Sequence, residues 1–242
     1  MEEYLSIREY QVEVVYNKPL TYDIKEVRFK LLEPKEIRFR PGQYLQFHIP
    51  AGKDEFVYRA YSISSQPSTP GEVELIVRLV PGGIGSTYIH NLEKGDRVTI
   101  SGPYGEFTLQ ENSRADVLCI GGGAGMAPLK SIIYSLFEKG TDRNVYLYFG
   151  VRAKKDLFYQ EELEKLKKDN PNFHYCFALS SPDESDEWEG ETGFIHLVLE
   201  KHIKDASNME AYLCGPPVMT DAAIKVLKEK GIDKNNIYYD KF

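Results

Sequence analysis

Residues 117–137 read Val-Leu-Cys-Ile-Gly-Gly-Gly-Ala-Gly-Met-Ala-Pro-Leu-Lys-Ser-Ile-Ile-Tyr-Ser-Leu-Phe. The stretch begins as an apolar run of strand character, passes through a glycine turn and ends in a segment with helical spacing of apolar residues. A helix that begins after a glycine turn offers free backbone N–H groups to an anion, and glycine lets a diphosphate approach the backbone. The stretch therefore predicts a nucleotide-binding strand–turn–helix unit. Its apolar helical face comprises Leu129, Ile132, Ile133, Leu136 and Phe137.

The turn departs from the common dinucleotide fingerprint at one position. A G-x-G-x-x-G pattern would place its third glycine where this chain has Pro128. Proline is tolerated in the first turn of a helix, because its missing N–H would have no intrahelical partner there. The pattern indicates a nucleotide site that differs from the common Rossmann one.

The second half of the chain, residues 113–242, alternates between strand and helix patterns. Such alternation predicts a doubly wound parallel sheet in an α/β domain. Asp156 is the expected N-cap of the helix at 157–168, and Gly140 is the expected stop of the preceding helix. The expected strands span 117–120, 145–150, 173–179, 211–214 and 237–240, and the expected helices span 128–139, 157–168, 194–203 and 217–230.

The first half, residues 1–112, is rich in short β-prone runs separated by Pro-Gly and Gly-Gly turns. Their even spacing predicts a small antiparallel barrel or sandwich. A short helix is expected after the glycine turn at 81–87, over residues 88–92. The polar segment 110–116 separates the two halves. The expected strands span 11–16, 22–31, 43–49, 56–63, 73–80 and 97–101.

Composition excludes several classes of protein. The 242 residues carry a net charge of −7 with the signs interspersed, which disfavours a nucleic-acid-binding surface. We expect no direct membrane span, because no apolar run is long enough, and residues 1–10 are too charged for a signal peptide. Cys119, Cys176 and Cys214 are far apart and predict neither a disulfide framework, a metal site nor an iron–sulfur centre. A reducing, cytoplasmic-facing compartment is expected.

Two further motifs lie in the first half. Arg59-Ala-Tyr-Ser62 ends a predicted strand, and Pro81-Gly-Gly-Ile-Gly-Ser-Thr87 forms a second glycine turn with two hydroxyls. Taken alone, Arg59 could be a surface charge, Tyr61 a strand aromatic, and the turn a hairpin capped by Ser86. Two anion-binding turns in two differently built domains favour a functional interpretation instead.

Five motifs follow one another along the chain, at 59–62, 83–87, 121–128, 214–217 and the aromatic C-terminus. In this order they resemble the ferredoxin–NADP⁺ reductase superfamily of two-domain flavoproteins. Within it, the chain is most similar to the FAD/NADH domains of the F subunits of sodium-translocating NADH:quinone oxidoreductases. Related multicomponent monooxygenase reductases share much of the pattern. The resemblance implies an antiparallel FAD-binding β-barrel at 1–112 and an NAD-binding α/β domain at 113–242. The stretches 100–107 and 192–196 add to the likeness.

The resemblance implies roles around the flavin. Tyr61 would pack on the isoalloxazine ring, and Ser62 would lie near flavin N5. Arg59 and the two hydroxyls of the 83–87 turn would bind the pyrophosphate, while 77–79 would run along the ribityl chain and ring edge. FMN in place of FAD stays open, because no adenine-binding segment is identified. The implied flavin-binding residues are Arg59, Ala60, Tyr61, Ser62, Val77, Arg78, Leu79, Gly83, Gly85, Ser86 and Thr87.

The resemblance also implies the nicotinamide side of the site. The residues of the 121–128 turn would face the NADH diphosphate, Cys214 would lie beside the nicotinamide, and Phe242 would cover the flavin face opposite Tyr61. Asp240 is shorter than the glutamate usual in the superfamily, and Phe242 lacks the hydroxyl of the usual tyrosine. The implied catalytic residues are Ser62, Cys214, Asp240 and Phe242. The implied dinucleotide-binding residues are Gly122, Gly123, Ala124, Gly125, Pro128, Cys214, Gly215, Pro216 and Phe242.

Charge favours NADH over NADPH. The loop after the third strand of the second half carries five carboxylates between residues 180 and 189 and no basic residue. Such a loop would repel a 2′-phosphate, which needs Arg or Lys nearby. One feature favours NADPH instead: the second strand is followed by three cations, Arg152, Lys154 and Lys155.

The leading hypothesis is an NADH-dependent, FAD-containing oxidoreductase that accepts a hydride and passes single electrons to a partner. The partner would be a ferredoxin-like iron–sulfur protein, or an iron–sulfur domain missing from this chain. The expected location is the cytoplasm, where the protein is either free or attached to the cytoplasmic face of a membrane complex. Two alternatives stay open: a stand-alone flavin or quinone reductase, and a flavin-binding electron-transfer subunit with little NADH turnover.

Overall fold

The structure, a computed structural model, describes residues 6–53 and 55–242. The chain divides into two compact units, the first formed by Met1–Leu109 with Lys130–Ser135 and the second by Gln110–Leu129 with Leu136–Phe242. Each unit contains one six-stranded sheet. The domain limits 1–112 and 113–242 stay a prediction, since the first unit also takes in residues 130–135.

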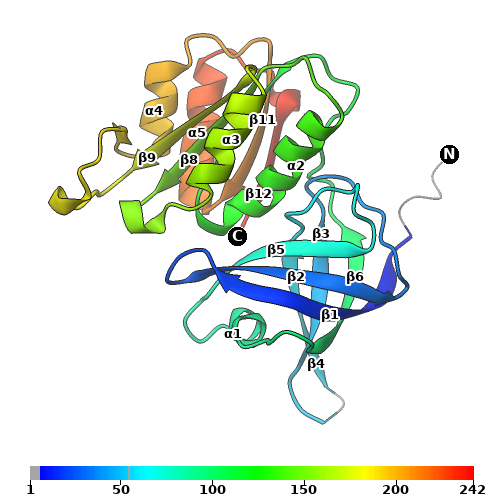
Figure 1. The fold of residues 1–242 in the computed structure, drawn as a ribbon. Helices are drawn as coiled ribbons and strands as arrows, with labels where there is room; N and C mark the ends of the chain where they lie inside the picture. The colour runs from blue at the N-terminus through cyan, green and yellow to red at the C-terminus, as the bar shows by residue number, and fades with distance from the viewer. Residues whose placement is uncertain (1–5, 54) are drawn as a thin grey trace. The chain divides into compact units, whose positions relative to one another are not determined.

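The first unit is an antiparallel sheet with strand order β4-β3-β6-β1-β2-β5 (Figure 1). A bridge between Ile63 and Leu75 joins the two outer strands of this order, so the sheet curls toward a barrel. Alternation explains the core: Leu45, Phe47 and Ile49 are buried on β3 while their neighbours are less so. The predicted β-barrel class is confirmed. The strands are β1 (Arg8–Pro19), β2 (Ile24–Glu33), β3 (Tyr44–Pro50), β4 (Phe56–Ser62), β5 (Glu72–Arg78) and β6 (Arg97–Tyr104).

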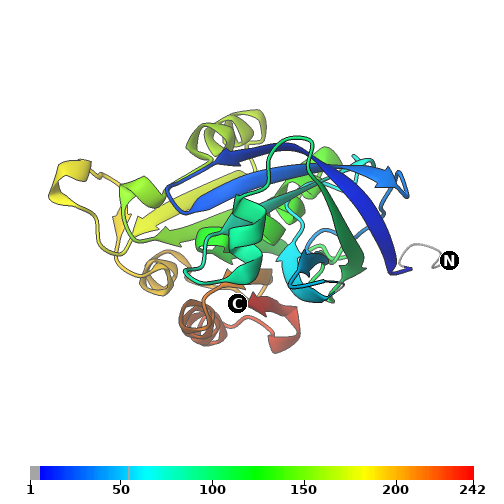
Figure 2. The same cartoon turned by 90° about the horizontal axis from the view of Figure 1, so that it is seen from below.

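Among the described residues of the segment 6–109, one short helix, α1 (Ile84–His90), packs against β3, β4 and β5 (Figure 2). The helix expected at 88–92 therefore begins earlier than predicted, directly from the glycine turn. Its other end is held by Asn17, whose Nδ2 donates to the carbonyl oxygens of Ile89 and Leu92, both at 2.8 Å. This cap satisfies helix-end carbonyls and comes from a distant strand, which local sequence does not reveal.

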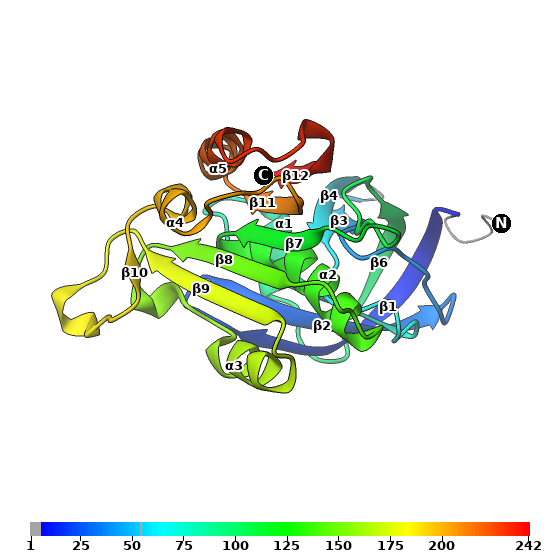
Figure 3. The ribbon, with the colours of Figure 1, turned by 90° about the horizontal axis from the view of Figure 1, so that it is seen from above.

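The second unit is a parallel sheet with strand order β10-β9-β8-β7-β11-β12, with helices on both faces (Figure 3). Helices α4 and α5 cover one face, and α2 and α3 lie on the other. The predicted doubly wound sheet is confirmed. The strands are β7 (Asp116–Gly121), β8 (Val145–Val151), β9 (Phe173–Leu179), β10 (Glu191–Thr192), β11 (Met209–Gly215) and β12 (Ile237–Lys241), and the helices are α2 (Met126–Glu138), α3 (Gln160–Asp169), α4 (Ile195–His202) and α5 (Pro217–Glu229).

Two details of the second unit differ from the sequence expectation. Strand β10 was not expected, because two residues are too few for a periodic pattern. The predicted N-cap Asp156 is wrong: its carboxylate accepts from the Ala153 N–H at 2.9 Å, and α3 begins later, after Tyr159 with φ +60°. Gly140, the predicted stop of α2, has a φ of +74° and confirms that expectation.

Apolar burial follows the predicted helical face of α2. Leu129, Ile132 and Ile133 are fully buried, and Leu136 is nearly so. Among the described residues, none of the helices combines the length and apolar character needed to cross a membrane.

Candidate functional site

The two motifs of the first half lie against each other in the first unit. Gly85, the second residue of α1, is buried against the side chains of Arg59 and Tyr61 on β4. A Cβ atom on this glycine would lie 2.5 Å from the Tyr61 hydroxyl and 2.8 Å from Arg59 Cγ. Only a residue without a side chain lets α1 approach β4 so closely. The 59–62 and 83–87 motifs therefore form one local site.

Tyr61 is held in place by the barrel core. Its ring meets the ring of Phe47 edge-on, with 5.6 Å between centroids and 88° between planes. Burial raises the pKa of Tyr61 to about 12, against the opposing effect of the Arg59 charge. The phenol therefore stays neutral, and a fixed neutral ring suits a planar aromatic ligand. Ser62 follows at the end of β4, half-buried opposite Tyr44.

The two hydroxyls of the 83–87 turn are used differently. The Ser86 hydroxyl accepts from the Val80 N–H at 3.0 Å and donates within the turn to the Gly83 carbonyl at 3.3 Å. Ser86 is only 5% exposed, whereas Thr87 is exposed. Of the two hydroxyls predicted to bind pyrophosphate, Thr87 is thus the one open to a ligand.

The predicted flavin contacts on and after β5 also separate into two kinds. Val77 points into the barrel core, and its carbonyl oxygen lies 2.9 Å from Nε2 of His90. Arg78 is exposed and pairs with Asp23 at 2.7 Å, and Leu79 is 38% exposed. Arg78 and Leu79 can offer side chains to a ligand, while Val77 supports the strand beneath them.

In the second unit, the 121–125 turn is fitted against the ends of two neighbouring strands. It follows β7 and leads through a short 3₁₀ turn (Gly123–Gly125) into α2. A Cβ at Gly125 would overlap the carbonyl oxygen of Cys214 on β11, and one at Gly122 would lie 2.8 Å from the carbonyl oxygen of Gly150 on β8. Both glycines are therefore required by the packing of the turn on the sheet edge.

Exposure divides the turn into packing positions and open positions. Gly122, Gly125 and Pro128 are buried, whereas Gly123 and Ala124 are half-exposed. Pro128 lies in the first turn of α2, as predicted. A diphosphate can thus reach the backbone at Gly123 and Ala124, while the buried residues set the shape of the turn.

Three residues around the turn are not singled out by sequence: Gly150, Ile195 and Met219. A Cβ at Gly150 would lie 2.9 Å from Cβ of Ile195, so α4 begins close over the end of β8. Met219, in the first turn of α5, lies against both Gly122 and Gly215. A glycine at the end of a predicted strand is a usable signal for Gly150, but the other two carry none.

Cys214 lies at the carboxyl end of β11, opposite Gly121 on β7 and Asp240 on β12. It is fully buried. Burial raises the pKa of its thiol well above the usual value, and the charge of Asp240 raises it further. Burial also raises the pKa of Asp240. The thiol is therefore a neutral, compact group at the sheet edge where α/β proteins bind ligands.

The chain end reaches the same edge of the sheet. Lys241 lies opposite Gly215 in the parallel pairing of β12 with β11, and Phe242 follows it with 60% of its surface exposed. Pro216 is exposed at the start of α5. The predicted residues 121–125, 214–216 and 240–242 are therefore brought together at one sheet edge.

Comparisons with known proteins match a part of each unit to a family of domains. Residues 11–109 match the family described as oxidoreductase FAD-binding domain, and residues 119–225 match the family described as oxidoreductase NAD-binding domain. The F subunit of the Na(+)-translocating NADH-quinone reductase of Klebsiella pneumoniae is 38% identical to this chain over an alignment of 283 positions. The alignment covers all of this chain and 69% of the Klebsiella protein. The chain belongs to the ferredoxin reductase family. The corresponding protein of Haemophilus influenzae is another relative, 37% identical with the same coverage.

The solved structures of two reductases share the fold. The Amycolatopsis cytochrome P450 reductase GcoB has a TM-score of 0.89 and 28% identity, covering 98% of this chain and 71% of that one. The ferredoxin reductase of carbazole 1,9a-dioxygenase has a TM-score of 0.85 and 30% identity, covering 98% and 70%. The chain is accordingly an NADH-dependent flavoprotein oxidoreductase of the ferredoxin reductase type with FAD and NADH as its cofactors, as the sequence predicts.

Proposed function

We propose that this flavoprotein accepts a hydride from NADH at flavin N5 and passes single electrons to an iron–sulfur protein or domain outside this chain or to a quinone reductase complex. The proposal depends most on the contact of Gly85 with Arg59 and Tyr61. This contact brings together a cation for a pyrophosphate, an aromatic ring for a flavin and a glycine turn. The Klebsiella and Haemophilus relatives bear the name of a Na(+)-translocating reductase, which supports attachment to the cytoplasmic face of a membrane complex.

The residues of the first unit fit FAD. Bound FAD supplies the redox chemistry, since a flavin exchanges both hydride and single electrons. Arg59 would bind the pyrophosphate through charge-assisted hydrogen bonds, and the exposed Thr87 hydroxyl would donate to it. Tyr61 would support the ring, and Ser62 would lie near N5. Ala60, Arg78 and Leu79 would complete the contact, while the buried Ser86 and Val77 keep the turn and strand in shape.

The residues of the second unit fit NADH. Gly123 and Ala124 expose backbone at the start of α2, a 13-residue helix whose dipole favours the diphosphate. Cys214 would lie beside the nicotinamide as a neutral thiol, with Asp240 next to it. Phe242, whose side chain is 60% exposed, would cover the flavin and move aside for nicotinamide. The catalytic roles of Ser62, Cys214, Asp240 and Phe242 all belong to this proposal.

The preference for NADH over NADPH gains support from the acidic loop. Nζ of Lys154 donates to the carbonyl oxygen of Asp186 at 2.7 Å, and the Lys154 N–H donates to its carboxylate at 3.2 Å. One of the three cations after β8 is thus held by the acidic loop after β9. A 2′-phosphate would meet this loop's carboxylates and a cation that is already engaged.

An anaerobic titration tests the proposed function. Protein loaded with FAD should be yellow, and NADH should bleach it within seconds without oxygen. A panel of ferredoxins and quinones then reoxidises the reduced protein, and the fastest acceptor identifies the partner class. A protein that takes up no FAD, or flavin that NADH does not bleach, overturns the proposal; fast reoxidation by quinones alone identifies a stand-alone quinone reductase.

A further inference from the structure

Two glutamates of the first unit are buried although they do not point into its apolar core. Glu26 on β2 is 3% exposed and Glu74 on β5 is 2% exposed. Their chain neighbours Val27 and Leu75 lie in the barrel core, so strand alternation puts both carboxylates on the opposite face of the sheet. Buried carboxylates are rare unless charged or hydrogen-bonding partners surround them. Partners from several parts of the first unit stabilise these two.

We call these glutamates and their partners the carboxylate cluster. The hydroxyl of Tyr16 on β1 lies 2.8 Å from a carboxylate oxygen of Glu26 and 2.7 Å from one of Glu74. Burial raises the pKa of Tyr16, and its hydrogen bond to Glu74 raises it further, so the phenol stays protonated and serves as a donor. The carboxylate cluster comprises Tyr16, Lys18, Glu26, Arg28, Glu74 and Lys130.

The three cations of the carboxylate cluster differ in exposure. Lys18 pairs with Glu26 at 2.6 Å and Arg28 pairs with Glu74 at 2.8 Å, and these two cationic side chains are 52% and 41% exposed. Lys130 forms an ion pair with Glu74, lies 3.5 Å from Glu26 and is only 17% exposed. Solvent and salt screen a buried ion pair least, so the pair of Lys130 with Glu74 is the strongest electrostatic link in the cluster.

Lys130 connects the carboxylate cluster to helix α2. Residues 130–135 of this helix belong to the first unit. The helix begins at Met126, directly after the turn proposed to hold the NADH diphosphate, so Lys130 lies about one helical turn beyond it. The next residue, Ser131, is fully buried and donates from its hydroxyl to the carbonyl oxygen of Ser65 at 2.7 Å. Two consecutive side chains thus fix the first turns of α2.

Glu74 connects the same cluster to the chain just beyond Ser62. The Ser64 N–H donates to the Glu74 carbonyl oxygen at 2.7 Å, and the Ser64 hydroxyl lies 3.4 Å from the Glu74 carboxylate. The Glu74 N–H donates to the Ser65 hydroxyl at 3.1 Å. Glu74 is therefore bonded both to the segment that follows Ser62 and to Lys130.

We propose that Glu74 and Lys130 are positioning residues for hydride transfer. They hold the end of β4, where Ser62 would lie near flavin N5, and the helix that begins at the turn where NADH would bind. The proposal rests on the proposed function, and neither side chain is among those expected to contact a cofactor. Hydride transfer depends steeply on the geometry of donor and acceptor, so a small displacement of Ser62 or of α2 lowers its rate.

The test separates the rate of hydride transfer from the binding of NADH. FAD-loaded Lys130→Met and Lys130→Arg are mixed with increasing NADH in an anaerobic stopped-flow experiment, which gives the limiting rate of flavin bleaching and the Kd for NADH. We expect Lys130→Met to lower the limiting rate at least about 10-fold while the Kd changes by less than about twofold. Lys130→Arg keeps the charge and should restore the rate to within about threefold of the wild type.

Hydrogen exchange gives a second readout that does not depend on activity. In the FAD-loaded protein without NADH, the amides of 126–135 and 63–66 should exchange faster in Lys130→Met than in the wild type or in Lys130→Arg. Ser131→Ala leaves no charge unpaired, so it keeps the test decisive if Lys130→Met does not fold. Because it removes the bond to Ser65, we expect the same pattern of exchange and a limiting rate about threefold lower.

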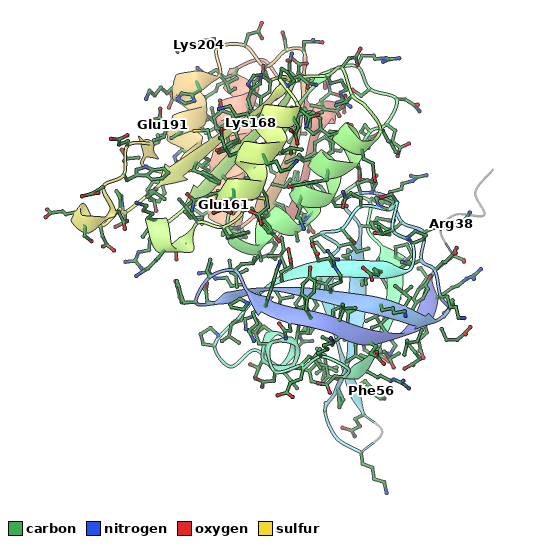
Figure 4. All side chains as sticks on the ribbon, viewed as in Figure 1. Arg38, Phe56, Glu161, Lys168, Glu191 and Lys204 are labelled. Carbon is green, nitrogen blue, oxygen red and sulfur yellow. The ribbon has the colours of Figure 1, made fainter. Side chains whose placement is uncertain are left out.

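Two matched controls make the same lysine-to-methionine change elsewhere. Lys139→Met breaks an exposed ion pair with Glu111, 2.7 Å long, just beyond the end of α2. Lys168→Met removes an exposed lysine of α3 (Figure 4 labels Lys168). We expect both to leave the limiting rate within about twofold of the wild type, because exposed charges contribute little.

Two results overturn the positioning role. One is an unchanged limiting rate in Lys130→Met or, if that variant does not fold, in Ser131→Ala. The other is a loss of rate in Lys130→Met that Lys130→Arg does not restore. Failure of the proposed function is distinct, because NADH would then fail to bleach the flavin of the wild-type protein as well.

Discussion

The two glycine turns look alike in sequence, but they need glycine for different reasons. At the 83–87 turn, the space a Cβ of Gly85 would take is occupied by the side chains of Arg59 and Tyr61. At the 121–125 turn, the corresponding space at Gly125 and Gly122 is occupied by backbone carbonyls at the ends of β11 and β8. Side chains can move aside, whereas strand backbone cannot move without disturbing a sheet.

Because the neighbours of the two turns differ, a substitution in each turn should have a different consequence. The first turn is joined to groups that would themselves contact FAD, so its geometry acts on ligand affinity. The second turn is joined to the parallel sheet, so its geometry acts first on the stability of the unit.

The largest effect is expected for Gly125→Ala. Its methyl group would overlap the Cys214 carbonyl oxygen, and we expect a loss of about 3 kcal/mol in the free energy of unfolding, with loss of NADH binding. Urea unfolding and an anaerobic NADH titration measure the two effects. Gly71→Ala is the control, because its Cβ would meet only an ordinary contact at 3.6 Å. A Gly125→Ala protein as stable as Gly71→Ala would show that the second turn is not set by the sheet edge.

Gly85→Ala should affect FAD more than folding. The added methyl would displace the flexible Arg59 side chain and the Tyr61 hydroxyl. We expect FAD to bind about 10-fold more weakly, equivalent to about 1.4 kcal/mol, with a stability loss of no more than that. Flavin fluorescence titration gives the Kd, and thermal unfolding of the FAD-free protein gives the stability. Unchanged affinity with a large drop in stability would make the two turns alike after all.

Two neighbouring substitutions separate structure from binding within the first turn. Ser86→Ala removes the hydroxyl that accepts from the Val80 N–H, and should cost about 1 kcal/mol of stability. Thr87→Ala removes an exposed hydroxyl, and should weaken FAD binding severalfold while leaving stability within about 0.5 kcal/mol. The same two measurements apply. If Thr87→Ala binds FAD as the wild type does, Thr87 has no part in holding the pyrophosphate.

The smallest effect is expected in the pH dependence. Burial raises the pKa of Asp240, so the native protein binds this proton more tightly than the unfolded chain does. The stability contribution of the protonated carboxyl is complete below the unfolded pKa and decreases as pH rises through the folded pKa.

Asp240→Asn cannot ionise, so its stability relative to the wild type should increase from acidic to neutral pH, which urea unfolding across that range measures. Tyr61, beside the first turn, has a pKa of about 12 and should contribute nothing in this range. A stability difference between Asp240→Asn and the wild type that does not change with pH would contradict the raised pKa of Asp240.

Most of the fold could be predicted from sequence, because its elements are periodic. Alternating residues such as those of β3 and the helical face from Leu129 to Leu136 depend only on near neighbours in the chain. The errors lie where a distant group intervenes: Asn17 caps α1, and the two-residue β10 exists only because β9 is beside it. The prediction of Asp156 as the N-cap of α3 is wrong, because its carboxylate accepts from the Ala153 N–H in a separate 3₁₀ turn that precedes α3.

Periodicity alone indicates a β-rich half followed by an α/β half, because it depends on near neighbours in the chain. The family, and through it FAD and NADH as cofactors, follow from the resemblance of the ordered motifs to known flavoproteins. The three-dimensional fold is needed to see which turn residues are open to a ligand, such as Thr87 rather than Ser86, and which are held by packing. It also places Met219 against the second turn. The exposure and packing of these residues depend on contacts between strands and helices that are far apart in the chain. No local stretch of sequence specifies such contacts.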